Sequence, residues 1–297
     1  MAPAAGAEPA IAAAPLPAPA TLPPFASPAA AGEGVWRPAG RRVDHVPAIY
    51  RTTLRAPGSG RAAGLAWMDT HLLAARLYSG SGSPGGGPWR YTAPVEPAEA
   101  ATLVAAFNGG FRMAVAGGGY YTEGRVVVPL RPGAASLVIY ANGSTNVGAW
   151  GTDVAMTPNV VGVRQNLILL VAGGRPVPQS ADWQQWGSTI GDVESIWRSG
   201  VGITADGALV YATGADLDPQ QLAQLLVRAG AVRAMQLDIN PEWTVLATFA
   251  PAAATGLASP ANGTSLVADT VQGPFTFFEP SWARDFITMS ARSGPIP

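Results

Sequence analysis

This 297-residue chain contains no cysteine and no lysine, and it has only two histidines. The lack of cysteine excludes disulfides, thiolate metal sites and a cysteine nucleophile. His45 and His71 have neither HExxH-like nor paired ligand spacing, so the sequence argues against a catalytic zinc site. No apolar run of about 18 residues occurs, and no membrane-spanning helix is therefore predicted.

Charge is also scarce in this chain. Charged residues make up 12% of it, the net charge is −1, and the 18 basic residues, all arginines, form no dense cluster. This distribution argues against a nucleic-acid-binding surface. Hydrophobic residues make up 48% of the chain, which is enough for a sizeable core in one large domain.

The first 34 residues differ in composition from the rest. They form an Ala/Pro-rich tract without the basic start and continuous apolar stretch of a signal peptide. We predict that residues 1–34 are a disordered spacer and residues 35–297 one folded domain, because such a tract has too little apolar surface to offset ordering. Spacers of this kind commonly join a domain to an anchor. We therefore expect a secreted or envelope-anchored protein whose signal or anchor lies outside this sequence.

Short apolar segments separated by turn residues dominate residues 35–297. Hairpins are predicted over residues 120–128, 136–150 and 201–212, and the second contains the Asn-Gly pair typical of tight hairpin turns. Further strands are predicted within residues 65–69, 72–78, 159–171, 231–239 and 282–290. Residues 96–106 predict a short helix that runs into a strand.

One longer helix is predicted over residues 218–230. Asp218 suits the N-cap, Pro219 suits the first helical position, and Gly230 suits the C-terminal stop. The apolar residues between them recur at helical spacing. Many hairpins with a few helices predict an α+β fold, a single domain with a mixed, hairpin-rich sheet and a few packed helices.

The segment MQLDINPEW, residues 235–243, gathers polar groups at the end of a predicted strand. Gln236, Asp238 and Asn240 share one face, opposite the apolar face that suits the core. Glu242 and Trp243 follow a proline that ends the strand, and the tryptophan could form an apolar wall or stack on a sugar. Two interpretations stay open: the acids belong to a site, or they satisfy backbone groups at a turn.

The stretch AAFNGGFRM, residues 105–113, places Asn108 at a strand end before Gly109 and Gly110. Backbone amides of such a turn can bind an oxyanion, although an ordinary Asn-Gly turn has the same pattern. Arg198 precedes a strand of small residues, where it could hold a phosphate or carboxylate or could simply pair on the surface.

Three further polar side chains are candidates for binding substrate, namely Arg112, Arg164 and Asn166. The sequence contains no P-loop, GxSxG elbow or GxGxxG fingerprint. No motif requires a cofactor, and an oxygen-ligated divalent cation remains an open alternative.

The order AFNGGF, RSGVGITADG, a helix and then GAVRAMQLD resembles the phosphodiester glycosidase domain family over residues 65–249. The resemblance implies an α+β domain that acts on sugar–phosphate diester bonds, often outside the cytoplasm. Asn108, Gly109 and Gly110 match the NGG motif of this family, Arg198 matches the arginine before its GIT-like strand, and Asp238 matches the aspartate of its LDGG-S motif. Here INPEW follows Leu237-Asp238 in place of the glycine-rich loop, which weakens the case for a phosphodiester substrate.

The leading hypothesis is a hydrolase that cleaves a glycosidic bond in an envelope or extracellular glycan, with a carbohydrate or sugar-phosphate substrate. Asp238 would act as nucleophile or general base and Glu242 as acid, because ordinary glycoside hydrolysis uses two carboxylates. Asn108 with the glycine amides would hold substrate oxygens, and Arg198 would neutralise an anion. The alternatives are a catalytically silent glycan-binding or scaffold protein of the same fold and a metal-dependent phosphodiesterase.

Overall fold

Eighteen strands form three sheets in the computed structural model, which describes residues 14–188, 191–253, 256–280 and 282–292. The largest sheet has the strand order β1-β2-β3-β14-β13-β15-β11-β12. Its strands are β1 (Arg37–Val43), β2 (Val46–Arg55), β3 (Ala62–Met68), β14 (Leu209–Leu217), β13 (Ile196–Thr204), β15 (Ala231–Gln236), β11 (Leu169–Ala172) and β12 (Arg175–Pro176).

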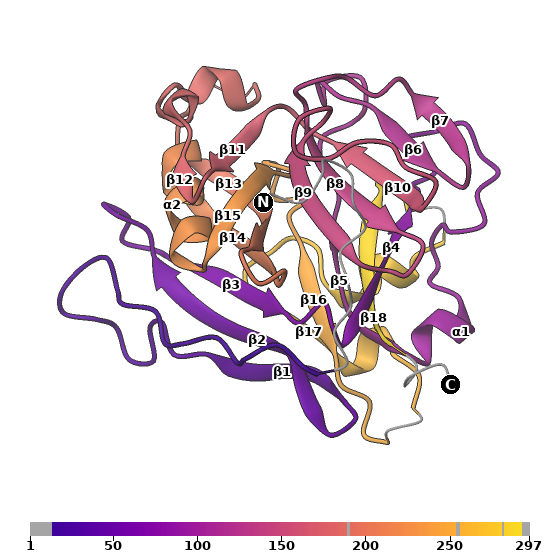
Figure 1. Ribbon diagram of the computed structural model, residues 1–297. Helices are drawn as coiled ribbons and strands as arrows, with labels where there is room; N and C mark the ends of the chain where they lie inside the picture. The colour runs from indigo at the N-terminus through magenta and orange to yellow at the C-terminus, as the bar shows by residue number, and fades with distance from the viewer. Residues whose placement is uncertain (1–13, 189–190, 254–255, 281, 293–297) are drawn as a thin grey trace.

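Two five-stranded sheets lie on the other side of the molecule from α2 (Figure 1). One has the order β7-β6-β10-β8-β9, with β6 (Tyr120–Thr122), β7 (Arg125–Val128), β8 (Ala135–Tyr140), β9 (Thr145–Ala149) and β10 (Val160–Gln165). The other has the order β17-β16-β5-β18-β4, with β4 (Leu73–Tyr78), β5 (Leu103–Asn108), β16 (Leu246–Phe249), β17 (Gly263–Ser265) and β18 (Phe286–Ala291).

The predicted fold class requires a correction. The three hairpins are confirmed. The chain is mainly β, however, and not a balanced α+β mix. Each pairing between named strands of the described residues is antiparallel, so the sheets are not mixed. Hairpin connections produce antiparallel neighbours, whereas parallel neighbours need long crossovers.

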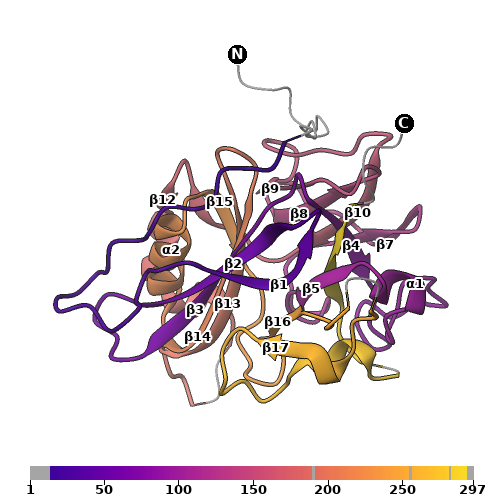
Figure 2. The same ribbon diagram turned by 90° about the horizontal axis from the view of Figure 1, so that it is seen from below.

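The predicted longer helix is confirmed as α2 (Pro219–Arg228). Asp218 and Gln221 form a reciprocal capping box: the Gln221 N–H donates to Asp218 Oδ1 at 2.7 Å, and the Asp218 N–H donates to Gln221 Oε1 at 3.0 Å. The apolar stripe of α2, which includes Leu222 and Leu226, packs on one face of the large sheet (Figure 2). The other helical segments are α1 (Pro97–Ala100) and the 3-10 turns η1 (Pro178–Ala181), η2 (Trp183–Trp186), η3 (Pro260–Asn262) and η4 (Pro274–Phe278).

The main core lies between the large sheet and the two smaller sheets. Buried residues of β15, β5 and β18, among them Met235, Phe107 and Ile287, belong to this cluster together with Leu237 just after β15. The apolar face predicted for residues 235–239 is thus buried at Met235 and Leu237, which holds the polar end of this segment in a fixed place.

Residues 14–34 have no helix or strand and lie against the domain. Leu22 is buried in the cluster under α2, and its N–H donates to the Gly34 carbonyl at 3.0 Å. The predicted boundary between residues 34 and 35 remains a prediction, and residues 1–13 of the predicted spacer and 293–297 of the predicted domain lie outside the described residues. None of the helices in the described ranges is long and apolar enough to cross a membrane.

Candidate active site

The polar strand ends predicted from the sequence meet at one end of the sheets. Asn108 is the last residue of β5 and pairs with Phe286 at the start of β18. Asp238 lies two residues beyond β15, where its carbonyl accepts from the Ser199 N–H of β13 at 2.9 Å. The three chain segments that carry residues 108–112, 236–243 and 284–285 therefore converge.

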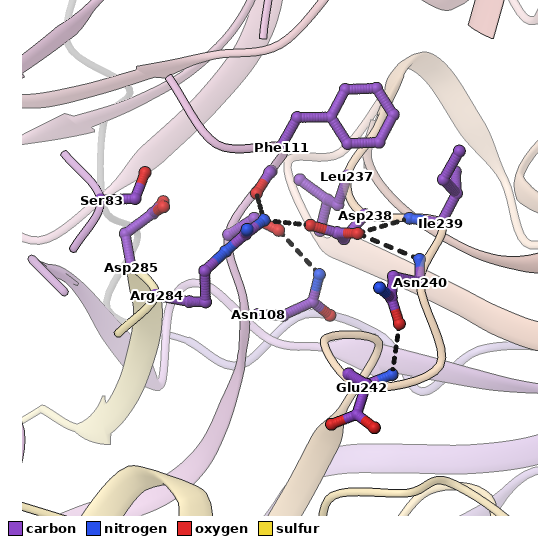
Figure 3. A network of polar contacts seen from close by, with 12 residues as sticks. Ser83, Asn108, Phe111, Leu237, Asp238, Ile239, Asn240, Glu242, Arg284 and Asp285 are labelled. Carbon is purple, nitrogen blue, oxygen red and sulfur yellow. Dashed lines mark hydrogen bonds and ion pairs between the residues drawn. The ribbon is translucent and has the colours of Figure 1, made fainter. Parts of the chain in front are cut away.

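Asp238 is held by backbone on one carboxylate oxygen and by an arginine on the other (Figure 3). Its Oδ1 accepts from the Ile239 and Asn240 N–H groups at 2.8 and 3.0 Å, and its Oδ2 forms an ion pair with Arg284. Asp238 is 3% exposed, so its orientation is set by these contacts and by packing. Each of the three donors favours the ionised carboxylate.

Burial acts against ionisation at both partners of this pair. It raises the pKa of Asp238 above the ordinary value of 3.8, although Arg284 and the two backbone donors offset part of the rise. It likewise lowers the pKa of Arg284, against the attraction of Asp238. A buried ion pair of this kind costs desolvation on both sides, so its presence is weak evidence for a stabilising role.

Arg284 has donors that the protein does not use. Its Nη2 bonds both Asp238 and the Gly110 carbonyl, the latter at 3.0 Å. Its Nε is buried without an acceptor, and no described residue accepts from its Nη1. The guanidinium carbon lies 5.0 Å from the ring centroid of Trp243. An anion that reaches this end of the site would thus meet a fixed cation with spare donors.

Asn108 is the first predicted site residue that the structure brings beside Asp238. Its Oδ1 accepts from the Tyr211 hydroxyl at 2.7 Å and from the Val245 N–H at 3.2 Å. Its Nδ2 donates to the Gly109 carbonyl and to Ser199 Oγ, at 2.7 and 3.1 Å. Since both ends of the amide have protein partners, Asn108 joins the segments of the site, and the predicted contact with substrate would require it to exchange one of these bonds.

Gly109 and Gly110 are needed for close packing. A Cβ atom at Gly109 would lie 1.9 Å from Asp285 Oδ2, and one at Gly110 would lie 2.7 Å from Asn166 Oδ1. The Gly109 N–H donates to the Asp285 carbonyl at 2.9 Å. The Gly109 amide is therefore already engaged, which argues against its predicted use to bind an oxyanion.

Arg164 forms a second ion pair directly behind these glycines. It is 1% exposed, and its Nε and Nη2 donate to the two oxygens of Asp285 at 2.8 and 3.2 Å. Its remaining donors bind the carbonyls of Gln165 and Phe111. Arg164 was predicted to bind substrate, but every terminal nitrogen has a protein acceptor and the residue supports the site from within.

Asn166 has a similar supporting place. It is fully buried, its Oδ1 accepts from the Phe111 N–H at 3.0 Å, and its Nδ2 donates to the carbonyls of Gln236 and Leu237. It was predicted to bind substrate. Instead it ties the segment after β5 to the end of β15, next to Asp238.

Arg198 and Gln236 lie apart from the Asp238–Arg284 pair. Arg198 is fully buried, and it donates to Gln236 Oε1 at 2.9 Å and to the carbonyls of Leu217, Glu194 and Trp186. Gln236 Nε2 also donates to the Trp186 carbonyl, at 2.9 Å. Burial lowers the pKa of Arg198 to about 10. Both side chains anchor the loop after η2, and the structure does not bring Arg198 to the position of an anion-binding residue.

A groove of about 450 Å³ opens beside Asp238 and Arg284. Three of the predicted binding residues line it, namely the exposed Arg112 and Asn240 and the half-buried Trp243. Gln184 and Gln185 of η2 also line it, together with Gly187 and Ser188 that follow η2. Apolar side chains complete the lining: Phe111, Val115, Leu167 and Ile239.

Glu242 points away from this groove. It is exposed, its Oε2 accepts from Gln272 Nε2 at 3.2 Å, and Figure 3 shows its carboxylate directed away from Asp238. Of the described residues that line the groove, Asp238 is the only acid. The geometry therefore does not support the predicted pair of catalytic carboxylates. Within the described ranges, no group of three or more acidic or histidine side chains could hold a metal ion.

Sequence reasoning missed Arg284 and Asp285. Both stand in the stretch SWARDFITMS, which was predicted only as a last strand. Adjacent opposite charges directly before an apolar strand are unusual in a chain with 12% charged residues, so this pair carried a usable signal. Tyr211 was also missed, because a tyrosine in a hairpin strand gives no indication of which side chain it meets.

Comparisons with known proteins give one family match and several solved structures of distant similarity. The family model for phosphodiester glycosidases matches residues 101–246, just under half of the chain. No curated protein is significantly similar in sequence.

Solved structures of distant similarity include the zebrafish N-acetylglucosamine-1-phosphodiester alpha-N-acetylglucosaminidase catalytic domain, auto-inhibited by its pro-peptide. It shares 13% identity over 87% of this chain and 88% of that chain, with a TM-score of 0.49. A hypothetical protein from Synechocystis shares 12% identity over 86% and 64%, with a TM-score of 0.42. A putative exported protein from Burkholderia pseudomallei shares 11% identity over 77% and 74%, with a TM-score of 0.30.

The matched segment contains Asn108 and Asp238, the two motif residues that lie at the candidate site. Arg284, which pairs with Asp238, lies beyond the matched segment. The resemblance inferred from the sequence motifs is thus confirmed: residues 101–246 match the family model of the phosphodiester glycosidases.

Proposed function

We propose that this protein hydrolyses the glycosidic bond of a sugar phosphodiester and releases a phosphate monoester. The proposal rests on the charged residues that line the groove: Asp238 is the one carboxylate, Arg284 lies beside it, and Arg112 lies at the rim. A family of phosphodiester glycosidases supports a glycosidase-type hydrolase, and the geometry adds a reason for the diester.

The single carboxylate suits a phosphate leaving group. An ordinary glycoside releases a sugar alkoxide, which needs a proton from a second carboxylic acid. A phosphate monoester is a much weaker base, with a second pKa of about 6, so it can depart without a general acid. A groove with Asp238 as its only acid therefore favours a diester over an unmodified glycan.

The two arginines would bind the phosphate. Arg284 lines the groove with a terminal nitrogen, Nη1, that has no acceptor among the described residues, and Arg112 contributes a second cation on the groove rim. As the anomeric carbon–oxygen bond breaks, its electron pair leaves with the phosphate, whose added negative charge faces these guanidinium groups. Fixed cations aimed at developing charge are a major source of rate enhancement.

Asp238 would act at the anomeric carbon. Its carboxylate either attacks this carbon directly or takes a proton from a water that attacks it, and both routes need the ionised form. The products are the free sugar and the phosphate monoester, so one water is consumed. Trp243, which borders Asp238 and Arg284, offers a flat face for the sugar ring.

Hydrolysis of methyl and aryl sugar-1-phosphodiesters tests the proposal, with the corresponding aryl glycosides without phosphate and a panel of envelope glycans assayed in parallel. We expect turnover of the diesters and little turnover of the neutral glycosides. Binding of the diesters without turnover would identify a catalytically silent glycan-binding or scaffold protein. Activity that a chelator abolishes and a divalent metal restores would identify a metal-dependent phosphodiesterase instead.

We also propose an envelope or extracellular location, supported by the Ala/Pro-rich segment of residues 1–34. Fractionation of cells that produce the full-length protein tests it. Recovery with the cytoplasmic marker proteins would contradict this location.

A further inference from the structure

The groove has an apolar half that the catalytic proposal does not use. Phe111, Val115, Leu167 and Ile239 line it next to the charged head at Asp238 and Arg284. Phe111 and Ile239 are 7% and 8% exposed and belong to one small cluster with Ala116. Figure 3 shows Phe111 and Ile239 on the side of Asp238 away from Glu242.

Val115 gives this half an unusually open apolar surface. It is 66% exposed and has the largest exposed fraction among the large exposed hydrophobic side chains of the described residues. A single exposed valine needs no explanation, but one that continues a wall of buried apolar side chains enlarges a ligand surface.

Leu167 reaches the groove at a conformational cost. Its φ is +54°, in the left-handed region that residues other than glycine, asparagine and aspartate rarely adopt. Two backbone bonds hold it there: the Leu167 N–H donates to the Ala116 carbonyl at 2.7 Å, and its own carbonyl accepts from the Ala135 N–H at 3.0 Å. Asparagine or glycine would fit this backbone better, so a leucine here indicates a role for its side chain.

The order of the groove residues shows which part of a substrate would lie there. Arg112 stands between Phe111 and Val115 in the sequence, and all three line the groove. A phosphate held by Arg284 and Arg112 would thus place its second ester group along the apolar wall. The sugar would lie at Asp238 and Trp243, on the other side of the phosphate.

Resting on the proposed function, we infer that the alcohol esterified to the phosphate is apolar, such as an alkyl, isoprenoid or aryl alcohol. The cavity of about 450 Å³ falls in the range of small-molecule sites. Gly187, directly after η2, packs against this apolar wall, since a Cβ atom there would lie 2.7 Å from Phe111 and 2.8 Å from Ile239.

A series of sugar-1-phosphodiesters that differ only in a methyl, butyl or octyl ester tests this inference. Alkyl alcohols change the leaving phosphate very little, so the series isolates binding. We expect kcat/KM to rise about fourfold for each methylene that is buried, mainly through a lower KM. Equal kcat/KM for methyl and octyl esters would overturn the inference while leaving the proposed hydrolysis intact.

Leu167→Asn and Val115→Asn are the informative variants. Asparagine tolerates the left-handed backbone, so Leu167→Asn removes the apolar side chain without adding strain. Each variant should reduce the octyl-to-methyl ratio of kcat/KM at least about tenfold. Val126→Asn is the matched control, because Val126 is 57% exposed on β7 and does not line the groove. A loss of preference in the control alone, or in no variant, would contradict the assignment.

The same question can be answered if no ester is hydrolysed. Calorimetric titration of the wild-type protein with octyl and methyl phosphate measures how much the apolar half of the groove contributes to binding affinity. If octyl phosphate binds more tightly than methyl phosphate, and Leu167→Asn weakens this binding, the apolar subsite is supported even though the proposed hydrolysis has failed. Equal affinities would overturn the subsite as well.

Discussion

The consecutive residues Arg284 and Asp285 enter two ion pairs that differ in their access to the groove. Asp285 pairs with Arg164, whose terminal nitrogens all have protein acceptors. Arg284 pairs with Asp238 through Nη2, lines the groove, and has no acceptor for its Nη1 among the described residues. The same pairing chemistry therefore serves two purposes: the sealed pair holds the strands together, and the open pair leaves charge available to a ligand.

Asp238→Asn should separate the two pairs most clearly. Asparagine keeps an acceptor for the Ile239 and Asn240 N–H groups but removes the charge that reacts. We expect kcat/KM for a sugar phosphodiester to fall by about 10²–10⁴-fold, in the range of a lost general base. The far-ultraviolet circular dichroism spectrum should stay unchanged, and full activity in this variant would remove the role given to Asp238.

Asp285→Asn should instead act on stability. It leaves Arg164 buried with one carboxylate fewer, and breaking a buried pair in this way costs about 3–5 kcal/mol. Urea denaturation should show a free energy of unfolding reduced by this order. A larger loss of stability in Asp238→Asn than in Asp285→Asn would reverse the assignment of the sealed and open pairs.

Arg284→Lys tests the spare donors of the open pair. Lysine keeps the charge beside Asp238 but loses the planar fork that could bind two phosphate oxygens. Hydrogen bonds to charged groups contribute about 1.5–3 kcal/mol, so we expect kcat/KM for the diester to fall on the order of 10- to 100-fold. Inhibition by inorganic phosphate should weaken in parallel, whereas unchanged inhibition would place the anion elsewhere.

The pH dependence of kcat/KM should show the effect of burial on the pKa of Asp238 in the open pair. The pKa of Asp238 is raised above 3.8 by burial, and the reaction needs its ionised form. As pH falls, kcat/KM should therefore decline through a pKa above this ordinary value. The same shift makes protonated Asp238 favour the folded state, a contribution that is present at low pH and lost as pH rises through the raised pKa. Asp238→Asn should remove that part of the pH dependence of unfolding, and its persistence would assign it to another group.

Glu242→Gln should have the smallest effect. Glu242 is exposed, its side chain bonds only Gln272 among the described residues, and it lies outside the groove lining. We expect kcat/KM to change by less than about twofold, in keeping with a surface substitution of about 0.5 kcal/mol or less. A loss comparable to that of Asp238→Asn would restore the pair of carboxylates predicted from the sequence.

Local patterns were sufficient for much of the fold. The Asp218 cap, the apolar stripe of residues 222–229 and the turn residues of the hairpins predicted α2 and three strand pairs. Period-two alternation after Ala231 predicted that Met235 and Leu237 enter the core and that Asp238 lies on the opposite, polar face near the end of the strand. These features depend on neighbours within a few residues, so the sequence contains them directly.

The partners of the site residues depend on contacts between distant segments. Asp238 meets Arg284 across 46 positions, Asn108 meets Tyr211 across 103, and Arg164 meets Asp285 across 121. Periodicity assigns a side chain to a face of its own strand, but the packing of three sheets determines which other strand ends there. For this reason Arg198, which the motif order made a site residue, became an internal anchor of a loop, and the unremarked Arg284 took the place beside the acid.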